Sequence, residues 1–271
     1  MPELPEVETL VTELACALGN QKISGLEIRN PSLLETPRSW FEKEIPGRKI
    51  VRVGRRGKFI SVYLSEGLVL WFHLGMTGQL LLKESLPSAT HVHFILSFED
   101  STQRLFYRDV RRFGRIVLTS DEEEAFPKAV RELGPEPWDW APEAFVSFVK
   151  GRRARIKSLL LDQRVVAGLG NIYADESLYR AGIHPLRRAE EVPRTRLSRL
   201  HQSICEVLQE AIECGGSSID DYLHLDGAKG QFQEFHQVYG RTGGGCVACG
   251  TPIRKIKLSG RSSSYCPRCQ K

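Results

Sequence analysis

The sequence predicts an α+β protein, with an N-terminal antiparallel β-sandwich flanked by helices, a helical region and a cysteine-rich tail. Three observations predict this class. β-Branched and aromatic runs lie between about residues 22 and 119 with no helix-length pattern between them, which favours a sandwich over an α/β sheet. Helical periodicity dominates residues 141–214. Four of the seven cysteines lie close together after residue 245.

The composition is that of an ordinary globular protein. The chain has 271 residues, of which 41% are hydrophobic and 26% charged. No apolar run approaches the ~20 residues of a transmembrane helix. The first residues contain neither a basic segment nor an apolar core, so a secretory signal is not expected. These observations indicate a cytoplasmic protein with no membrane partner.

The positive charge is concentrated at the C-terminus. Residues 235–271 contain seven Lys or Arg and no Asp or Glu. The rest of the chain therefore has 31 basic residues against all 33 acidic ones. A basic tail on a near-neutral body indicates a polyanionic partner.

The first element is a helix over residues 5–18. Its apolar residues recur on one helical face, at Val7, Leu10, Val11, Leu14 and Leu18. Pro5 suits the first helical turn, where its missing N–H has no cost. Glu6 and Glu8 lie where the helix dipole favours anions. Gly19 is a natural end for this helix.

The later elements follow in order. Strands are expected at "KFISVYL", "GLVLWFHL", "HVHFILSFED" and "QRLFYRDV", and two helical pieces at "RIKSLLLDQRVVAGLGNIYADESLYRAGIHP". Gly168 and Gly170 lie at the turn between these helices, and Asn171 is placed to cap the second one. The expected domains are residues 1–125, a linker over 126–140, a helical domain over 141–235 with a glycine-rich loop at 215–231, and the tail 236–271.

The tail contains a metal-binding motif. Cys246, Cys249, Cys266 and Cys269 are spaced as C-x2-C-x16-C-x2-C. Two such pairs present four thiolates in a tetrahedron, which is the ligand set of a structural Zn²⁺. Four protein ligands leave no open coordination position, so the predicted zinc folds the tail and takes no part in chemistry.

The amino terminus offers a nucleophile. Removal of the initiator methionine before a proline exposes the secondary amine of Pro2, with Glu3 beside it. An amine forms a Schiff base only when neutral. An α-amino group has a reference pKa of about 8, roughly 2.5 units below that of lysine. The terminal amine is therefore ready at neutral pH without burial.

Five motifs in order resemble the formamidopyrimidine-DNA glycosylase family of bacterial base-excision repair enzymes. They are "MPELPEVET", "HLGMTG" at 73–78, "RDVRRFG" at 108–114, "GLGNIYADESL" at 168–178 and the four-cysteine finger. The resemblance covers the whole chain. It departs from the family at Val110, where proline is frequent. It implies a helix–two-turn–helix domain over 141–235 and excision of 8-oxoguanine and formamidopyrimidines from double-stranded DNA by a monomer.

The resemblance also implies catalytic roles. Pro2 would attack C1′ of the damaged nucleoside and expel the base. Glu3 would act as general acid and base around the sugar. The iminium would acidify C2′, so that β- and δ-elimination cleave the strand at the abasic site. Lys58, in "RRGKF", would act at the phosphate beside the lesion. Arg261 would clamp a second phosphate and donate a proton to the last elimination. Without the resemblance, the sequence favours the interpretation of Lys58 as a solvated charge at a strand end.

DNA contacts are implied at seven positions: His73, Met76, His91, Arg111, Phe113, Arg152 and Asn171. A glycosylase takes its target base out of the stack. Met76, Arg111 and Phe113 match the family's wedge, the side chains that fill the space left by the flipped base. For Phe113 a structural role is also plausible from the sequence, because aromatic residues are common at strand ends. Residues 215–231 correspond to a cap over 8-oxoguanine.

Two alternatives stay open on the sequence. The enzyme could prefer oxidised pyrimidines, as in the endonuclease VIII branch, although the "PELPE" start favours the first branch. Alternatively, a zinc ribbon on a helical module could bind nucleic acid without catalysis. That alternative accounts for the basic tail and the cysteines, but it leaves the Pro-Glu start and Met76, between two glycines, unexplained.

Overall fold

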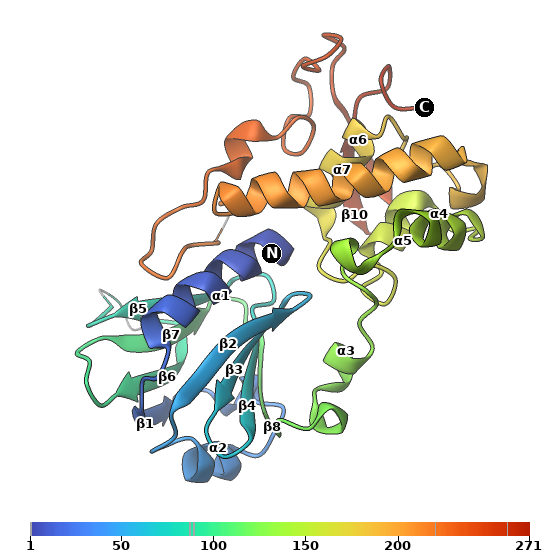
Figure 1. The fold of residues 1–271 in the computed structure, drawn as a ribbon. Helices are drawn as coiled ribbons and strands as arrows, with labels where there is room; N and C mark the ends of the chain where they lie inside the picture. Colours follow the sequence, from blue (N-terminus) through green and yellow to red (C-terminus); the bar gives the residue numbers. More distant parts are fainter. Residues whose placement is uncertain (1, 87, 89, 220, 259) are drawn as a thin grey trace. The chain divides into compact units, whose positions relative to one another are not determined.

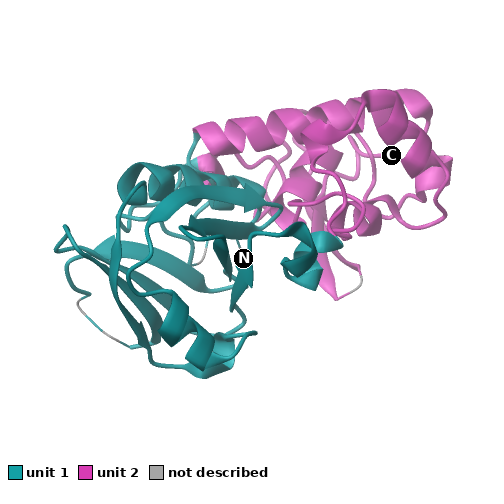
Figure 2. Cartoon of the chain, turned by 60° about the horizontal axis from the view of Figure 1, so that its bottom comes forward, with its two compact units in different colours: residues 1–132, 214–231 teal, residues 133–213, 232–271 magenta. Residues whose placement is uncertain are grey.

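The computed structural model describes residues 2–86, 88, 90–219, 221–258 and 260–271. The chain divides into two compact units. Unit 1 comprises residues 1–132 and 214–231, and unit 2 comprises residues 133–213 and 232–271 (Figures 1 and 2). The glycine-rich loop thus packs with the N-terminal segment, although it follows the helices in sequence. The three boundaries between the four regions expected from the sequence stay a prediction.

Unit 1 contains the predicted antiparallel β-sandwich. One four-stranded sheet has the order β1-β6-β7-β5 and the other β2-β3-β4-β8 in the described residues. The strands are β1 Ile23–Ile28, β2 Ile50–Arg56, β3 Phe59–Leu64, β4 Leu68–His73, β5 Gly78–Lys83, β6 Val92–Phe98, β7 Arg104–Asp109 and β8 Arg115–Ser120. Each strand pairs antiparallel with its neighbours.

Strand β4 is buried on both faces, which explains its unbroken apolar sequence. Leu70 and Phe72 face the core between the two sheets. Val69 and Trp71 face a second cluster outside it, together with Val130 of α3 (Lys128–Arg131). The Trp71 indole donates a hydrogen bond to Thr119 Oγ1 at 3.1 Å. The segment that joins the two units therefore covers the outer face of this sheet.

Helix α1 (Leu4–Leu18) confirms the predicted N-terminal helix. Its buried face joins the sandwich core, with Val7, Leu10 and Leu14 almost fully buried. Pro5 lies in the first turn, and the Gly19 N–H closes the last turn on Ala15 O. Figure 1 shows α1 lying along β2.

The expectation that no helix interrupts the strand region was wrong. Helix α2 (Arg38–Glu44) lies between β1 and β2 and follows a 3-10 turn at Pro31–Leu33. It has seven residues, which is too short to develop a helical repeat of apolar positions. It is held by Phe41, a fully buried side chain in the sandwich core.

Unit 2 contains helices α4 (Pro142–Lys150), α5 (Ile156–Leu161), α6 (Asn171–Arg180) and α7 (Arg194–Glu213). The turn between α5 and α6 places Gly168 at φ +91°. The sequence predicted that Asn171 caps α6, and this prediction was wrong. Gly170 is the N-cap and Asn171 is the first helical residue, one position too late to cap. Its Oδ1 is buried with no hydrogen-bond partner among the described residues.

The C-terminal hairpin of β9 (Arg254–Leu258) and β10 (Arg261–Tyr265) is tied to α5 and α6. Lys157 and Asp175 form a fully buried ion pair at 2.6 Å. The Lys157 ammonium also donates to Ser263 Oγ at 2.8 Å, and Asp175 accepts the Ser264 N–H at 2.8 Å. The next residue, Glu176, accepts the backbone N–H groups of residues 237–239. Unit 2 is therefore a helical body with the finger fixed to it.

Candidate active site and metal centre

The start of α1 is buried, and the carboxylates of Glu3 and Glu6 cap it. Pro2 is buried, and Glu3 and Glu6 are 2% and 1% exposed. Glu3 and Glu6 form a capping box, in which the Glu3 N–H donates to Glu6 Oε2 at 2.7 Å. This arrangement restrains a terminus that would otherwise fray. It holds the buried residue Pro2 at a fixed position before α1.

Lys58 lies in the tight turn between β2 and β3, where Gly57 has φ +55°. Its side chain is only 7% exposed, so it is not the solvated strand-end charge that the sequence alone allowed. The turn is tied to α1. Arg55 donates to Glu8 Oε2 at 2.6 Å and to Gly57 O at 3.0 Å. The helix with Pro2 and the turn with Lys58 are therefore positioned by one ion pair.

His73 ends β4 opposite Phe59, and their rings are 4.7 Å apart. Burial lowers the pKa of His73 to about 4, with smaller contributions from the positive charges of Lys58 and Arg115. The imidazole is therefore neutral at neutral pH. Its Nδ1 accepts the Gly75 N–H at 3.3 Å, so His73 helps to shape the turn that presents Met76.

Three predicted wedge residues are exposed. Met76 and Phe113 have 39% and 50% of their surface exposed, and Arg111 is also exposed. The Arg111 guanidinium lies 4.6 Å from the centre of the Phe113 ring, within the range of a cation–π contact. Phe113 is therefore not a core aromatic. An arginine and two apolar side chains project from two adjacent turns.

Asp109, a fully buried residue at the end of β7, joins these two turns. Its Oδ1 accepts the hydroxyl of Thr77, which lies beside Met76, and the Arg111 N–H at 3.2 Å. Its Oδ2 accepts the Gly114 N–H at 2.9 Å. One buried carboxylate therefore sets the geometry of all three exposed side chains.

The two turns also pack backbone to backbone. A Cβ on Gly75, which has φ +60°, would lie 2.6 Å from the Phe113 carbonyl carbon. A Cβ on Gly114 would lie 1.6 Å from the Tyr107 hydroxyl. Only glycine fits these positions. His91 and Arg112, on either side of Asp109, have φ of +62° and +56°, and such conformations cluster at functional sites. His91 is exposed, and its carbonyl accepts the Asp109 N–H at 2.9 Å.

The other predicted DNA-contacting and catalytic residues lie in unit 2. Arg152 is exposed after α4, with its guanidinium 4.3 Å from the Phe148 ring centre. Asn171 begins α6, where backbone N–H groups point outward. Arg261 is exposed at the turn of the β9–β10 hairpin and lines a cavity of about 260 Å³ with Asp162.

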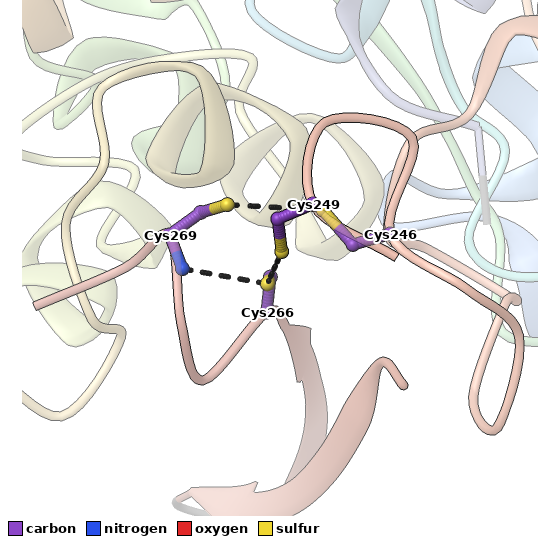
Figure 3. A group of neighbouring side chains, drawn as sticks. All are labelled: Cys246, Cys249, Cys266 and Cys269. Atoms are coloured by element: carbon purple, nitrogen blue, oxygen red, sulfur yellow. Dashed lines mark hydrogen bonds between the residues drawn. The ribbon is translucent and has the colours of Figure 1, made fainter. Parts of the chain in front are cut away.

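The four cysteines meet as predicted. Their sulfur atoms all lie within 4.8 Å of one another (Figure 3). Cys246 and Cys269 Sγ are 3.8 Å apart, and Cys249 and Cys266 Sγ are 3.5 Å apart. Four sulfurs about 2.3 Å from a shared ion would be spaced by about this much. The donor set therefore fits one structural Zn²⁺.

Two groups of predicted residues lie within unit 1. Pro2, Glu3 and Lys58 are buried, on a helix and a turn that the Arg55–Glu8 ion pair joins, and the wedge residues are exposed. Three residues that hold these groups were not predicted to do so from the sequence. They are Asp109, Thr77 and Glu6, of which Glu6 was expected only to complement the helix dipole. A signal existed for Asp109, because an aspartate between a strand and a turn frequently accepts the backbone N–H two residues on. No helix among the described residues is long and apolar enough to span a membrane.

Family models match three parts of the chain. Residues 1–116 match the formamidopyrimidine-DNA glycosylase N-terminal domain, and residues 133–222 match the formamidopyrimidine-DNA glycosylase H2TH domain. Residues 246–271 match the zinc finger found in FPG and IleRS. The three matches cover the sandwich as far as the start of β8, the helices α4 to α7 and the four-cysteine centre.

Relatives match the full length of the chain. The formamidopyrimidine-DNA glycosylase of Solibacter usitatus is 47% identical over 272 residues, covering 100% of both chains. That of Bacillus subtilis is 42% identical over 277 residues, covering 100% of this chain and 99% of the relative.

Solved structures of the Lactococcus lactis Fpg are also similar. A mutant of that protein in complex with a Fapy-dG containing DNA superposes with a TM-score of 0.93 at 39% identity, covering 100% of both chains. A complex with an abasic site containing DNA has a TM-score of 0.92 at 38% identity, covering 99% of both chains.

The metal centre gives a first prediction. Cys249→Ser removes one thiolate, and a structural zinc site of this kind contributes on the order of 10–16 kcal/mol to folding. Zinc content measured on the purified protein should fall from about one ion per chain to nearly none. Binding to duplex DNA should be lost, while near-ultraviolet dichroism of the sandwich tryptophans persists. Cys16→Ser, at an exposed cysteine outside the centre, is the control. A mutant that keeps its zinc would contradict the assignment.

Asp109 gives a second prediction. In Asp109→Asn an amide NH₂ replaces one of the two acceptor oxygens. Where it replaces Oδ2, the Gly114 N–H is left unpaired at a cost of about 1–3 kcal/mol. Where it replaces Oδ1, the Thr77 hydroxyl and the Arg111 N–H lose this shared acceptor, although the Arg111 N–H still donates to Thr77 Oγ1 at 3.0 Å. Trypsin should cut after Arg111 and Arg112 at least several times faster than in the wild type, and thermal unfolding should occur at lower temperature. Asp100→Asn, at an exposed aspartate, should change neither. Equal cleavage rates in the two variants would refute the role of Asp109.

Proposed function

The chain belongs to the formamidopyrimidine-DNA glycosylase family, and we propose from this that it excises oxidised purines from duplex DNA and cleaves the strand at the abasic site. The observation that carries the proposal is the buried arrangement at the start of α1. Pro2, Glu3 and Lys58 are all buried in unit 1, and the Glu8–Arg55–Gly57 chain of contacts links the helix to the Lys58 turn.

The nucleophile is the nitrogen of Pro2 once Met1 has been removed. A terminal amine is substantially neutral near pH 8, whereas a lysine needs strong perturbation to be so. The nitrogen lone pair attacks C1′, the C1′–N9 bond breaks and the base departs with its electron pair. Because α1 is held by its capping box and core, the amine approaches C1′ from a fixed position.

Glu3 moves the protons of this step. After the attack, its carboxylate takes the proton from the nitrogen of Pro2 and passes it to the sugar ring oxygen as the C1′–O4′ bond opens. The freed lone pair of the nitrogen then forms the iminium between Pro2 and C1′. The iminium acidifies C2′, so loss of a C2′ proton expels the 3′ phosphate, and a second elimination expels the 5′ phosphate. Lys58 places its ammonium at the phosphate beside the lesion, and Arg261 at a second phosphate. The burial of Lys58 supports this role, because burial strengthens its interaction with an anion.

The zinc ion has a structural task. When bound by Cys246, Cys249, Cys266 and Cys269, it stabilises the fold of the tail that contains Arg261. The hairpin itself is positioned by Lys157 and Asp175, which bind its second strand. The chemistry is thus assigned to the terminal amine and to side chains of the protein.

The exposed wedge fills the space of the flipped base. Extrusion of a base costs a few kcal/mol, least for a damaged base. Met76 inserts as an apolar side chain, Phe113 stacks on a neighbouring base and Arg111 pairs with the orphaned partner. Their exposure supports this assignment, because large apolar side chains at turn tips have no structural reason to be there.

The remaining contacts are to the phosphate backbone. We assign Arg152, Asn171, His91 and His73 to this role. The N-terminus of α6 favours an anion near Asn171. His73 can contribute a neutral N–H only, because its pKa is about 4. The enzyme acts as a monomer in the bacterial cytoplasm, and the domain boundaries at 125, 140 and 235 stay part of this proposal.

Of the alternatives, the non-catalytic zinc ribbon is disfavoured by family membership over the whole chain. Preference for oxidised pyrimidines is the second candidate, since the Lactococcus lactis Fpg also has a complex with an oxidized pyrimidine containing DNA. Nicking of duplexes with 8-oxoguanine or an oxidised pyrimidine compares the two. We expect the purine lesion to be cleaved with the larger kcat/KM.

The amino terminus gives a third prediction. Any residue retained before Pro2 turns its amine into an amide, which is not basic and cannot form the iminium. A variant with an uncleavable N-terminal extension should lose base release and strand cleavage by several orders of magnitude. Its binding to an abasic-site duplex should persist and should fall steeply with salt. The same extension followed by a protease site, then removed, is the control. Full activity in the extended form would remove Pro2 from the mechanism.

The wedge gives a fourth prediction. Arg111→Ala removes the side chain that faces the unpaired partner base, so cleavage should slow. The ratio of cleavage rates between the most and the least preferred opposite base should fall by about tenfold. Arg112→Ala, at the neighbouring exposed arginine, is the control. Any loss of cleavage rate in this variant should be the same for all four duplexes, so that the preference among opposite bases does not change. Cleavage rates on 8-oxoguanine opposite each base measure this. An unchanged opposite-base preference in Arg111→Ala would contradict the assignment.

A further inference from the structure

The loop over residues 214–231 is docked on α1 and on the free edge of β5. Tyr222 and Leu225 are 6% and 5% exposed and join the sandwich core. Leu82 of β5 donates its N–H to Leu225 O at 2.9 Å. The side chains of Gln79 and Lys83, also on β5, donate to carbonyls of Asp221 and Asp226. The loop therefore has a defined closed position in unit 1.

Glu13 of α1 fastens the loop at two points. Its Oε2 accepts the Leu225 N–H at 2.8 Å, and its Oε1 lies 2.8 Å from His224 Nδ1. The other nitrogen of the same ring, Nε2, lies 2.9 Å from Gly215 O at the base of the loop. A Cβ on Gly215 would lie 2.6 Å from His224 Cε1, so the ring packs directly on the loop backbone.

These contacts require one proton more than a neutral histidine and an ionised glutamate contain. Gly215 O can only accept, so Nε2 must bear a hydrogen. An ionised Glu13 also only accepts, so Nδ1 must bear a second one. The closed loop therefore contains either an imidazolium at His224 or a protonated Glu13. Closure takes up a proton wherever the open loop has a neutral histidine, near and above neutral pH.

Other charged groups around the ring do not remove this requirement. Glu6 lies on α1 beside Gly216, and its negative charge favours the imidazolium. Lys83 of β5 lies 3.9 Å from a Cβ on Gly227 and opposes it. Within the loop, Tyr222 stays neutral because burial raises its pKa. The loop's own sequence adds three aspartates, at positions 220, 221 and 226, and one lysine, Lys229.

We propose that Glu13 and His224 are positioning residues that hold the loop closed over the flipped base, and that recognition of an oxidised purine weakens as pH rises through neutrality because closure needs their proton. The proposal rests on the proposed function, in which this loop caps the lesion. An abasic site presents no base to cover. Its cleavage is therefore independent of the loop.

The test is the ratio of kcat/KM for an 8-oxoguanine duplex to that for an abasic-site duplex. Groups that serve both reactions, such as Pro2 and Glu3, cancel in this ratio. In the wild type it should fall by about three- to tenfold from pH 6 to pH 8. In Glu13→Gln it should be flat and near the wild-type value at pH 6, because the amide donates to Nδ1 of a neutral His224 while its oxygen accepts the Leu225 N–H. In His224→Gln, whose side chain takes up no proton, it should be flat and near the wild-type value at pH 8. Glu13→Ala should lower it at every pH, because the Leu225 N–H also loses its acceptor.

Glu99→Gln is the matched control, because it breaks an ion pair of unit 1, Lys22–Glu99 at 2.7 Å, that does not touch the loop. It should keep the wild-type profile. Deuterium exchange of residues 215–231 in the DNA-free protein gives an independent readout. After correction for intrinsic rates, wild-type protection should fall between pH 6 and 8 and that of Glu13→Gln should not.

Two results would overturn the proposal: a wild-type ratio and protection that do not change with pH, or the same decline in both glutamine variants. If the wild type cleaves neither duplex, the proposed function fails instead, and deuterium exchange still decides whether Glu13 and His224 hold the loop.

Discussion

The buried carboxylate of Glu6 is the contact on which the candidate active site depends. Its Oε2 accepts the Glu3 N–H at 2.7 Å, and its Oε1 accepts the Ser217 N–H at 2.7 Å. Charge-assisted bonds of this kind are about twice as strong as neutral ones. One side chain therefore fixes the start of α1, where the proposed nucleophile Pro2 lies, and the glycine-rich loop proposed to cover the lesion. Gly216, at φ +81°, has no room for a Cβ beside the same carboxylate.

Buried carboxylates that accept backbone N–H groups recur in both units. Asp109 holds the two turns of the wedge, and Glu176 holds the segment that leads into the finger at residues 237–239. Each acceptor fixes a stretch of backbone that has no regular secondary structure of its own. This explains how residues on turns, such as Met76 and Phe113, are presented at fixed positions although they make few packing contacts.

Local patterns in the sequence predicted much of this structure. Helix α1 follows from apolar periodicity, the sandwich from its β-branched runs, and the metal centre from cysteine spacing. Each signal lies within a short window of sequence. Helix α2 was missed because a helix of seven residues is too short to show a repeat of apolar positions. The prediction that Asn171 caps α6 was wrong because Asn171 is already the first residue of that helix.

The supporting contacts were out of reach for a different reason. Glu6 and Ser217 are 211 positions apart, as Glu13 and Leu225 are 212. No local pattern encodes such a pair, because each partner is an ordinary polar or apolar residue in its own segment. The family resemblance supplied the roles of Lys58 and Arg111, whereas their burial and exposure became known only from the structure.

The central claim is that the chain's own terminal amine bonds to the damaged nucleoside. The most direct measurement is reduction with borohydride during reaction on 8-oxoguanine duplex, followed by proteolysis and mass spectrometry of the trapped peptide. Our account predicts that Met1 is absent and that the deoxyribose remnant is attached to the nitrogen of Pro2. Attachment to Lys58, or strand cleavage with no trapped species, would contradict it.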